Sequence, residues 1–371
     1  MAKASLIKCP SYQPDQIGPA VERALGLLGG MGAFVKRGQR VLLKPNLLSA
    51  RRPDQAVTTH PAVVEEVIKL VKEAGGIPVL GDSPAGAVKS LEEFWATTSM
   101  LEVCRRHSVE LVSFEGSGVC LRELNGRKYH LAKPAAEAEV IINLPKLKTH
   151  SLTLMTGAIK NMYGVIPGLK KSNYHKQAPK PWDFSSLLAD IYALSRPVLN
   201  IVDAVVGMEG FGPSAGNPRH LGFILAGGDG VALDAAAAHL LGRHPLDIPT
   251  TKLAYQRGLG EARLDRIELL GDGFTPLRDF VWPPNWFYAL VPGFLARHAA
   301  RLFWVKPAID PTRCVNCGYC VESCPVSALV SAGTVPEFNY KICINCLCCS
   351  EVCPQKAVYQ MRSPVAKLLG R

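Results

Sequence analysis

Short apolar runs alternate with amphipathic stretches over the first 275 residues of the chain. Residues 40–44 and 140–144 are rich in branched apolar side chains, and each run predicts a buried strand. Residues 61–74 repeat valine near a 3.6-residue period, which predicts an amphipathic helix. Further strands are expected at residues 78–81, 110–114, 198–202 and 221–225. Strands that alternate with helices predict an α/β domain with a mainly parallel sheet over residues 1–275.

The C-terminal part has a different pattern, which is set by cysteines at fixed spacing. Four cysteines form a Cys-x₂-Cys-x₂-Cys-x₃-Cys-Pro run, and a matching run follows 29 residues later. The cysteines are Cys314, Cys317, Cys320 and Cys324 in the first run, and Cys343, Cys346, Cys349 and Cys353 in the second. A loop with cysteines at every third position can wrap three corners of an iron–sulfur cube, and the cysteine before proline points away from it. The spacing predicts two [4Fe–4S] clusters in a small α+β domain at residues 308–362.

The two runs and their flanking residues resemble the bacterial two-[4Fe–4S] ferredoxins. In that family the fourth cysteine of each run binds the cluster of the other run. The resemblance implies one cluster on Cys314, Cys317, Cys320 and Cys353, and a second on Cys343, Cys346, Cys349 and Cys324. A pair of zinc sites is the alternative, but zinc sites usually use paired cysteine knuckles. Cys348, beside Cys349, is expected to be a packed thiol, with an exchange of ligand roles as the alternative.

Composition and charge narrow the class of protein. The chain has 371 residues, of which 48% are hydrophobic, and a net charge of +11, so it allows a large core and favours anionic ligands or partners. The N-terminus has no apolar signal stretch, and no apolar run is long enough to span a bilayer. Twelve cysteines, eight of them in a metal-ligand pattern, suit a reducing compartment. We therefore expect a cytoplasmic protein.

Polar side chains follow several of the predicted strands, where ligands of parallel α/β sheets bind. Residues 140–182 also contain seven lysines and no acidic residue. An unbalanced positive stretch attracts an anion, although a solvated basic loop is the alternative. The expected anion-binding residues are Lys44, Asn46, Lys146, Lys148, Lys160 and Asn161. His150 and His175 are the expected proton donors because histidine titrates near neutrality, and ordinary hydrogen-bonded histidines are the alternative.

Residues 1–245 resemble the domain of unknown function family 362, which often occurs fused to a two-cluster ferredoxin. The matching stretches include residues 44–47, 59–61, 81–84, 144–150, 157–164, 203–210 and 227–234. The resemblance implies the α/β fold and the pairing with a ferredoxin domain. It implies no particular reaction.

Residues 276–307 form a connector that is rich in Trp, Phe, Pro and Arg. We expect an aromatic hinge that packs the small domain onto the large one. The alternative is a peripheral membrane contact through Arg297, His298 and Arg301 beside the aromatic groups, and it is not favoured.

Two functions fit these features. The first is a ferredoxin-type oxidoreductase, in which two [4Fe–4S] clusters pass electrons from a redox partner protein to a small anionic substrate. The second is a non-enzymatic electron carrier or assembly factor whose N-terminal domain docks on a partner protein. Nucleic acid is not expected as a partner, because the basic segment has few stacking aromatics and no recognised motif.

Overall fold

The structure is a computed structural model that describes residues 1–86, 90–168, 170–283 and 305–364. Its centre is a ten-stranded sheet in the order β12-β1-β11-β10-β7-β2-β3-β4, to which β8 and β9 are joined through β10. The strands are β1 (Ala2–Lys8), β2 (Arg40–Pro45), β3 (Ile77–Asp82), β4 (Glu110–Ser113), β7 (Val140–Leu144), β8 (Lys146–His150), β9 (Leu154–Thr156), β10 (Leu199–Glu209), β11 (Asn217–Gly227) and β12 (Ile267–Gly271).

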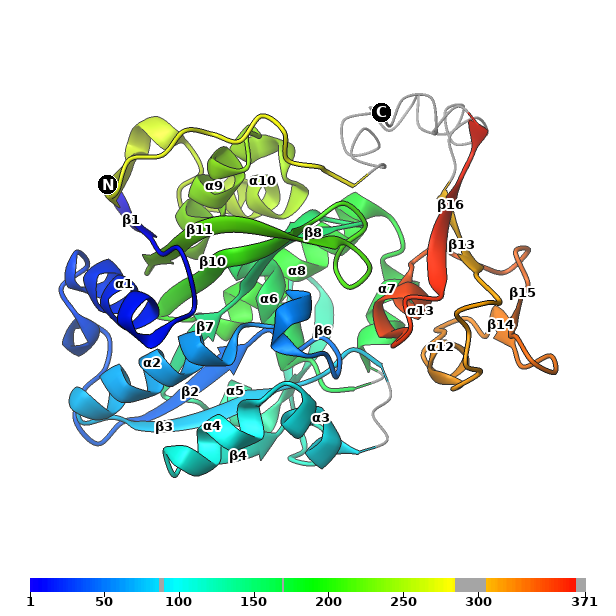
Figure 1. The fold of residues 1–371 in the computed structure, drawn as a ribbon, viewed down its shortest axis with the longest axis horizontal. Helices are drawn as coiled ribbons and strands as arrows, with labels where there is room; N and C mark the ends of the chain where they lie inside the picture. The colour runs from blue at the N-terminus through cyan, green and yellow to red at the C-terminus, as the bar shows by residue number, and fades with distance from the viewer. Residues whose placement is uncertain (87–89, 169, 284–304, 365–371) are drawn as a thin grey trace.

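The prediction of a mainly parallel sheet is confirmed. Strands β4, β3, β2, β7 and β10 run parallel to one another, and β1 runs parallel to β12. The antiparallel exception on this path is β11, which pairs with both β1 and β10. The fold is therefore α/β with one antiparallel insertion near an edge of the sheet (Figure 1).

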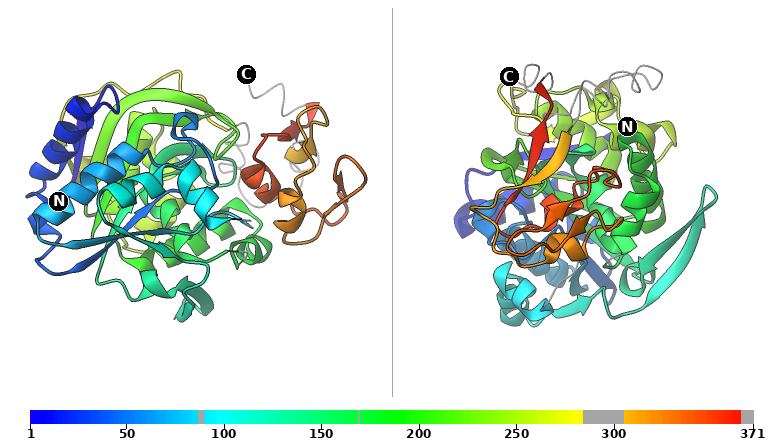
Figure 2. Two further views of the ribbon diagram at one scale, coloured as in Figure 1. Left: turned by 60° about the horizontal axis from the view of Figure 1, so that its bottom comes forward. Right: turned by 90° about the vertical axis from the view of Figure 1, so that its right-hand side faces the viewer.

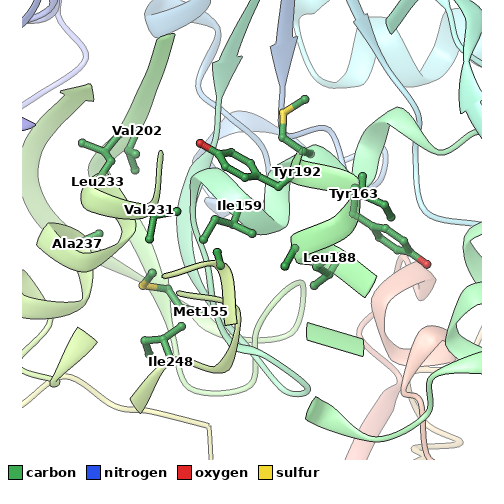
Figure 3. Packing of buried hydrophobic residues seen from close by; sticks show 14 of the residues in the cluster. Met155, Ile159, Tyr163, Leu188, Tyr192, Val202, Val231, Leu233, Ala237 and Ile248 are labelled. Carbon is green, nitrogen blue, oxygen red and sulfur yellow. The ribbon is translucent and has the colours of Figure 1, made fainter. Parts of the chain in front are cut away.

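Helices cover both faces of the sheet. Helices α1 (Pro14–Gly26), α2 (Pro61–Glu73) and α4 (Met100–Arg106) pack on one face, with α3 (Leu91–Thr97) beside them. The other face is covered by α6 (Ala158–Asn161), α8 (Pro181–Ser195), α9 (Gly230–Leu240) and α10 (Pro249–Gln256). Figure 3 shows part of this second core, where Ile159, Tyr192 and Val231 come from three different helices. Burial of both faces accounts for the continuous apolar runs of the strands.

Strand β8 was not expected from the sequence, and it directs the chain toward the C-terminal domain. The chain leaves β7 at Leu144, and β8 then pairs with β10, with Lys146 opposite Asp203. All five residues of β8 are buried although three of them are Lys or His. Four of the five side chains are polar, which is typical of an exposed strand, so the partners that bury them could not be inferred locally.

Two further segments complete the large domain. Strands β5 (Val119–Leu124) and β6 (Arg127–Ala132) form a two-stranded hairpin, next to the short α5 (Lys133–Ala136). Helix α7 (Lys170–Gln177) lies on the side of the domain that faces the C-terminal part (Figure 1). The Gly-rich turn before α9 serves as a cap, because the Asp229 carboxylate accepts hydrogen bonds from Val231 N and Ala232 N.

The C-terminal domain is small and made of short elements. Strand β13 (Val305–Ile309) pairs antiparallel with β16 (Val358–Arg362), and β14 (Leu329–Val330) pairs with β15 (Glu337–Phe338). Its two short helices are α12 (Tyr319–Glu322) and α13 (Cys348–Val352), and each contains the third cysteine of its run. Figure 2 shows this domain against one end of the large domain, with α13 turned toward it.

Most of the aromatic connector, including Arg297, His298 and Arg301, lies outside the described residues. In the described part of the chain, none of the helices combines the length and the apolarity that crossing a membrane requires.

Candidate functional site

The eight cysteines of the two runs surround two separate hollows in the C-terminal domain. The first hollow is lined by Cys314, Cys317, Cys320 and Cys353. The second is lined by Cys324, Cys343, Cys346 and Cys349, together with Cys348. Each hollow therefore receives three cysteines of one run and the Cys-Pro cysteine of the other. Among the described residues, no three His, Cys, Asp or Glu side chains close on a point that suits a single ion.

The two cysteine loops have the same backbone path. Left-handed residues occur at Asn316 and Gly318 in the first loop and recur 29 positions later at Asn345 and Leu347. The backbone N–H of Ala328 donates to Cys324 Sγ over 3.1 Å, and the N–H of Ala357 donates to Cys353 Sγ over 3.2 Å. Hydrogen bonds of this kind stabilise a thiolate, so the residues present fit iron–sulfur clusters.

Polar contacts join the cysteine domain to the large domain. The Arg51 guanidinium, which is 5% exposed, donates to the carbonyls of Cys353 and Pro354. Ser172 of α7 donates to Ser323 O over 3.2 Å, and Ser214 donates to Ser350 O over 3.0 Å. These bonds hold α13 and the Cys-Pro turn against the large domain, so the two domains share one polar interface.

A cavity lies at this interface and takes its walls from both domains. The large domain contributes residues from the ends of β2 and β3, from α6 and from α7, and the small domain contributes Ser323, Cys348, Glu351 and Val352. Its polar lining from the large domain includes Lys44, Asn46, Asp82, Ser83, Lys160, Asn161, Lys171, Ser172 and His175. Cys348 lines both this cavity and the second cysteine hollow, so one side chain belongs to both walls.

Two lysines of the cavity are already paired within the large domain. Lys44 Nζ lies 2.8 Å from Asp82 Oδ1 and donates to Pro45 O over 2.9 Å. Lys171 Nζ donates to the hydroxyl and the carbonyl of Ser83 and to Pro84 O. An ammonium has three hydrogens, so Lys171 has none left for a ligand in this arrangement. Burial lowers the pKa of Lys171 to about 7.

Lys160 differs from these lysines. It is 8% exposed, and its ammonium lies 5.4 Å from the Tyr163 ring centre and 5.9 Å from that of Phe184. No described residue accepts a hydrogen bond from its Nζ. The same cavity holds two other buried groups without a hydrogen-bond partner in the described structure, His175 Nδ1 and Ser323 Oγ. All three groups can donate to an oxygen atom of a ligand.

A chain of side-chain amides supports this side of the cavity. Lys148 Nζ donates to Asn46 Oδ1 over 2.9 Å, and Asn46 Nδ2 donates to Asn161 Oδ1 over 2.8 Å. Asn161 Nδ2 then donates to Asn143 Oδ1 over 2.7 Å, and Asn143 Nδ2 donates to Asn200 Oδ1 over 2.8 Å. Lysine can only donate, so it fixes the direction of every amide behind it. The amides are thereby held in one orientation.

Lys146 belongs to a separate buried network. Its ammonium lies 2.9 Å from Asp203 Oδ2 and donates to the Tyr12 hydroxyl over 2.7 Å. The Tyr12 hydroxyl donates to Asp203 Oδ1, and the Tyr12 ring stacks on His60 with centres 3.6 Å apart. His60 also caps α2, because its Nδ1 accepts from Ala62 N. These groups pair with one another and do not line the cavity.

Glu351 of α13 is the acidic group that the small domain brings to the cavity. It is 6% exposed, and its Oε1 lies 3.3 Å from His150 Nε2. His150 Nδ1 accepts from the N–H groups of Leu152 and Thr153, so the ring hydrogen is on Nε2. Despite burial, the contact with His150 and the nearby charge of Lys160 hold the pKa of Glu351 at about 2, so it is a carboxylate at neutral pH.

The two histidines predicted as proton donors are neutral at pH 7. Burial lowers the pKa of His150 to about 4 and that of His175 to about 3. His175 also stacks on Phe184, with ring centres 4.2 Å apart. Neither imidazole carries a spare proton near neutrality, so each is a hydrogen-bonding group of the site at that pH.

Stability is expected to fall between pH 7.5 and pH 5.5 because of these imidazoles. Burial lowers the pKa of His60, His150 and His175 from 6.5 to about 4, 4 and 3. The unfolded chain therefore binds three protons near pH 6.5 that the folded chain binds only below about pH 4. Between pH 7.5 and pH 5.5 each of these protons lowers the free energy of unfolding by about 1.4 kcal/mol in total, so we expect a loss of about 4 kcal/mol by pH 5.5.

Anaerobic urea denaturation at the two pH values measures this loss. The exposed His220 is the control, since replacing it with glutamine should leave the pH dependence unchanged. Replacing His150 with glutamine should remove about one third of the loss. An unfolding free energy that does not change over this range would contradict the account.

The structure brings together some of the anion-binding residues and one of the two proton donors predicted from the sequence. Lys44, Asn46, Lys160, Asn161 and His175 line the cavity. Lys146, Lys148 and His150 lie behind its wall or in a neighbouring network, and they are not among the lining residues. Sequence reasoning missed Glu351, Cys348, Ser323 and Lys171 as lining residues. The repeated glutamate of the two cysteine runs was the one available signal for Glu351.

The fold and the cysteine hollows define an iron–sulfur protein with an α/β domain. The 4Fe-4S binding domain model matches residues 307–330, so the chain contains a domain for at least one [4Fe–4S] cluster and has an iron–sulfur electron-transfer role. The family model described as "Domain of unknown function (DUF362)" matches residues 41–239. The chain belongs to this family.

Three known proteins are similar to parts of this chain. A thylakoid-associated protein of Synechocystis sp. is 39% identical over 258 residues, which make up 69% of this chain and 79% of that protein. NADH-quinone oxidoreductase subunit I 2 of Geobacter metallireducens is 58% identical over 33 residues, 9% of this chain and 25% of that subunit. The lactate racemase apoprotein of Thermoanaerobacterium thermosaccharolyticum has a TM-score of 0.40 and 15% identity over 68% of this chain and 55% of that chain, a likeness too low to carry an argument.

Proposed function

We propose that this protein passes electrons from a redox partner protein through two [4Fe–4S] clusters to a small anion in the interdomain cavity, as a ferredoxin-type oxidoreductase. The observation that carries the proposal is the position of Cys348, which lines both the second cysteine hollow and the cavity. A ligand in the cavity would therefore lie next to the residues that hold a cluster. The cytoplasmic location and the identity of the partner remain predictions.

Two clusters are supported by the two hollows, each of which offers four cysteine sulfurs. Such clusters exchange one electron at a time. The protein's own contribution is to hold the thiolates, donate the backbone N–H groups of Ala328 and Ala357 to sulfur, and dock the domain through Arg51. A two-electron reduction of the ligand would use one electron from each four-cysteine site.

The anion is supported by three donors that converge on the cavity. Lys160, His175 and Ser323 all line it. In the part of the chain that the structure describes, His175 Nδ1 and Ser323 Oγ have no hydrogen-bond partner, and the contacts of Lys160 Nζ are with the Tyr163 and Phe184 rings. Buried donors without partners cost free energy, which an oxyanion would recover. Burial lowers the pKa of Lys171 to about 7, so it is the cavity group that we propose as the proton source in place of the neutral histidines, with one of its hydrogen bonds to Ser83 or Pro84 exchanged for one to the ligand.

The alternative function needs a basic surface that an acidic partner protein can reach. Four lysines of the basic segment, Lys146, Lys148, Lys160 and Lys171, are at most 8% exposed. Lys176 and Lys180 are exposed. The burial of most of this charge inside the large domain and the cavity favours a small ligand over a docked protein.

Anaerobic reoxidation tests the proposed function. The protein is reduced, freed of excess reductant, and mixed with a panel of small anions while the visible absorbance of the clusters is followed. We expect reoxidation by at least one member of the panel, saturating with its concentration. If no small anion accepts electrons while a partner protein does, the carrier function is correct and the oxidoreductase proposal fails.

A further inference from the structure

The two cysteine runs carry the same glutamate at the same position, and only one of the two glutamates faces the cavity. Glu322 follows Cys320 by two residues, and Glu351 follows Cys349 by two residues, 29 positions further along. Glu322 is exposed, whereas Glu351 is 6% exposed and lines the interdomain cavity. The repeat therefore provides one carboxylate in solvent and one in the cavity, on matching helices.

The charged side chains of the cavity leave a small positive excess. Lys44 is paired with Asp82 over 2.8 Å, so this pair contributes no net charge. Lys160 and Lys171 remain on the positive side, and Glu351 is the remaining carboxylate of the lining. Three lysines against two carboxylates leave one positive charge when Lys171 is protonated. One negative charge on a ligand balances these lining side chains, and the negative charge of a cluster held behind Cys348 would add to the repulsion of a second one.

We propose that Glu351 sets the charge specificity of the cavity, so that a small monoanionic oxyanion binds and a dianion is rejected. This inference rests on the proposed function, because it concerns the ligand of the same cavity. Lys160, His175 and Ser323 donate to the bound oxygens. The second charge of a dianion has no counter-charge left and is repelled by Glu351, and repulsion between buried charges is weakly screened.

Glu351 acts here through its charge and its position. It contacts His150 of the large domain, whose Nε2 lies 3.3 Å from Glu351 Oε1 and whose neutral ring cannot cancel that charge. Lys160 is the nearby cation, yet within the described chain the two form no ion pair at 4.0 Å or less. A monoanionic ligand fits between the two side chains, with its negative end at Lys160 and its uncharged part toward Glu351.

Calorimetric titration of the oxidised holoprotein tests the charge specificity without any electron transfer. Two matched pairs of probes have similar shapes and different charges: methanesulfonate with sulfate, and acetate with oxalate. The wild-type protein should bind each monoanion at least about tenfold more tightly than its dianionic partner. The Glu351→Gln variant should lower that ratio at least about tenfold, and the matched Glu322→Gln variant should leave it unchanged.

Iron content and the visible spectrum of each variant establish that its clusters are intact. The inference is overturned if the wild-type protein binds dianions as tightly as monoanions. It is also overturned if Glu351→Gln leaves the ratio of monoanion to dianion affinity unchanged, or if Glu322→Gln lowers that ratio as well. Complete absence of binding by all four probes overturns it as well. If the expected binding pattern holds but no monoanion reoxidises the clusters, the charge specificity stands and the proposed electron delivery fails.

Discussion

Replacing Lys160 with methionine should slow the anion-dependent reoxidation of the reduced protein by at least about a hundredfold, since it removes a buried charge partner of the anion. Lys160 is the cavity lysine whose ammonium has no hydrogen-bond acceptor among the described residues, whereas Lys44 and Lys171 are held by Asp82 and Ser83. Methionine keeps the length and the apolar stem of the side chain, which packs beside Tyr163. The loss should therefore come from the charge.

The exposed Lys176 provides the matched control within the same basic stretch. Its replacement with methionine removes one positive charge at the surface, which salt screens, so reoxidation should change less than about twofold. A chemical oxidant that needs no binding site should reoxidise all three proteins equally fast. Equal rates for wild type and Lys160→Met with the anion would contradict the role of Lys160.

Replacing Cys349 with alanine should remove about half of the iron, because one of two four-cysteine sites loses a ligand. Replacing Cys348 with alanine should leave the iron content unchanged. In the 29-residue repeat, Cys349 is equivalent to Cys320, whereas Cys348 is equivalent to Tyr319. Cys348 lines both the cavity and the second cysteine hollow, as expected for a packed thiol in the wall between them.

Iron analysis and low-temperature EPR of anaerobically purified variants measure this difference. The Cys120→Ala variant is a suitable control, because Cys120 lies in the β5–β6 hairpin of the large domain. Loss of iron in Cys348→Ala together with full iron in Cys349→Ala would contradict the prediction and would make Cys348 the cluster ligand.

Features that depend on neighbouring residues in the sequence could be predicted. The strand at residues 140–144 and the helix at residues 61–74 follow from local apolar periodicity, and the structure has both as β7 and α2. The grouping of cysteines into two sets of four follows from loop spacing and the family resemblance. Lys44 and Asn46 could be expected near a site because they follow a strand of a parallel sheet.

Features that depend on how the two domains meet could not be predicted. Glu351 and Glu322 have the same local sequence context, and only the docking of α13 decides which of them is buried. Lys146 and Lys148 could not be assigned for another reason, because their partners within the large domain, Asp203 and Asn46, are distant in sequence. Burial also moves the pKa of His150 and His175 away from neutrality, which the sequence cannot show.

The central claim is that eight cysteine sulfurs hold two iron–sulfur cubes beside the cavity. Iron and acid-labile sulfide in anaerobically purified protein measure this claim most directly. The account predicts about eight iron atoms and about eight sulfides per chain, with an EPR signal of two coupled clusters after reduction. About four iron atoms per chain, or zinc in place of iron and sulfide, would contradict it.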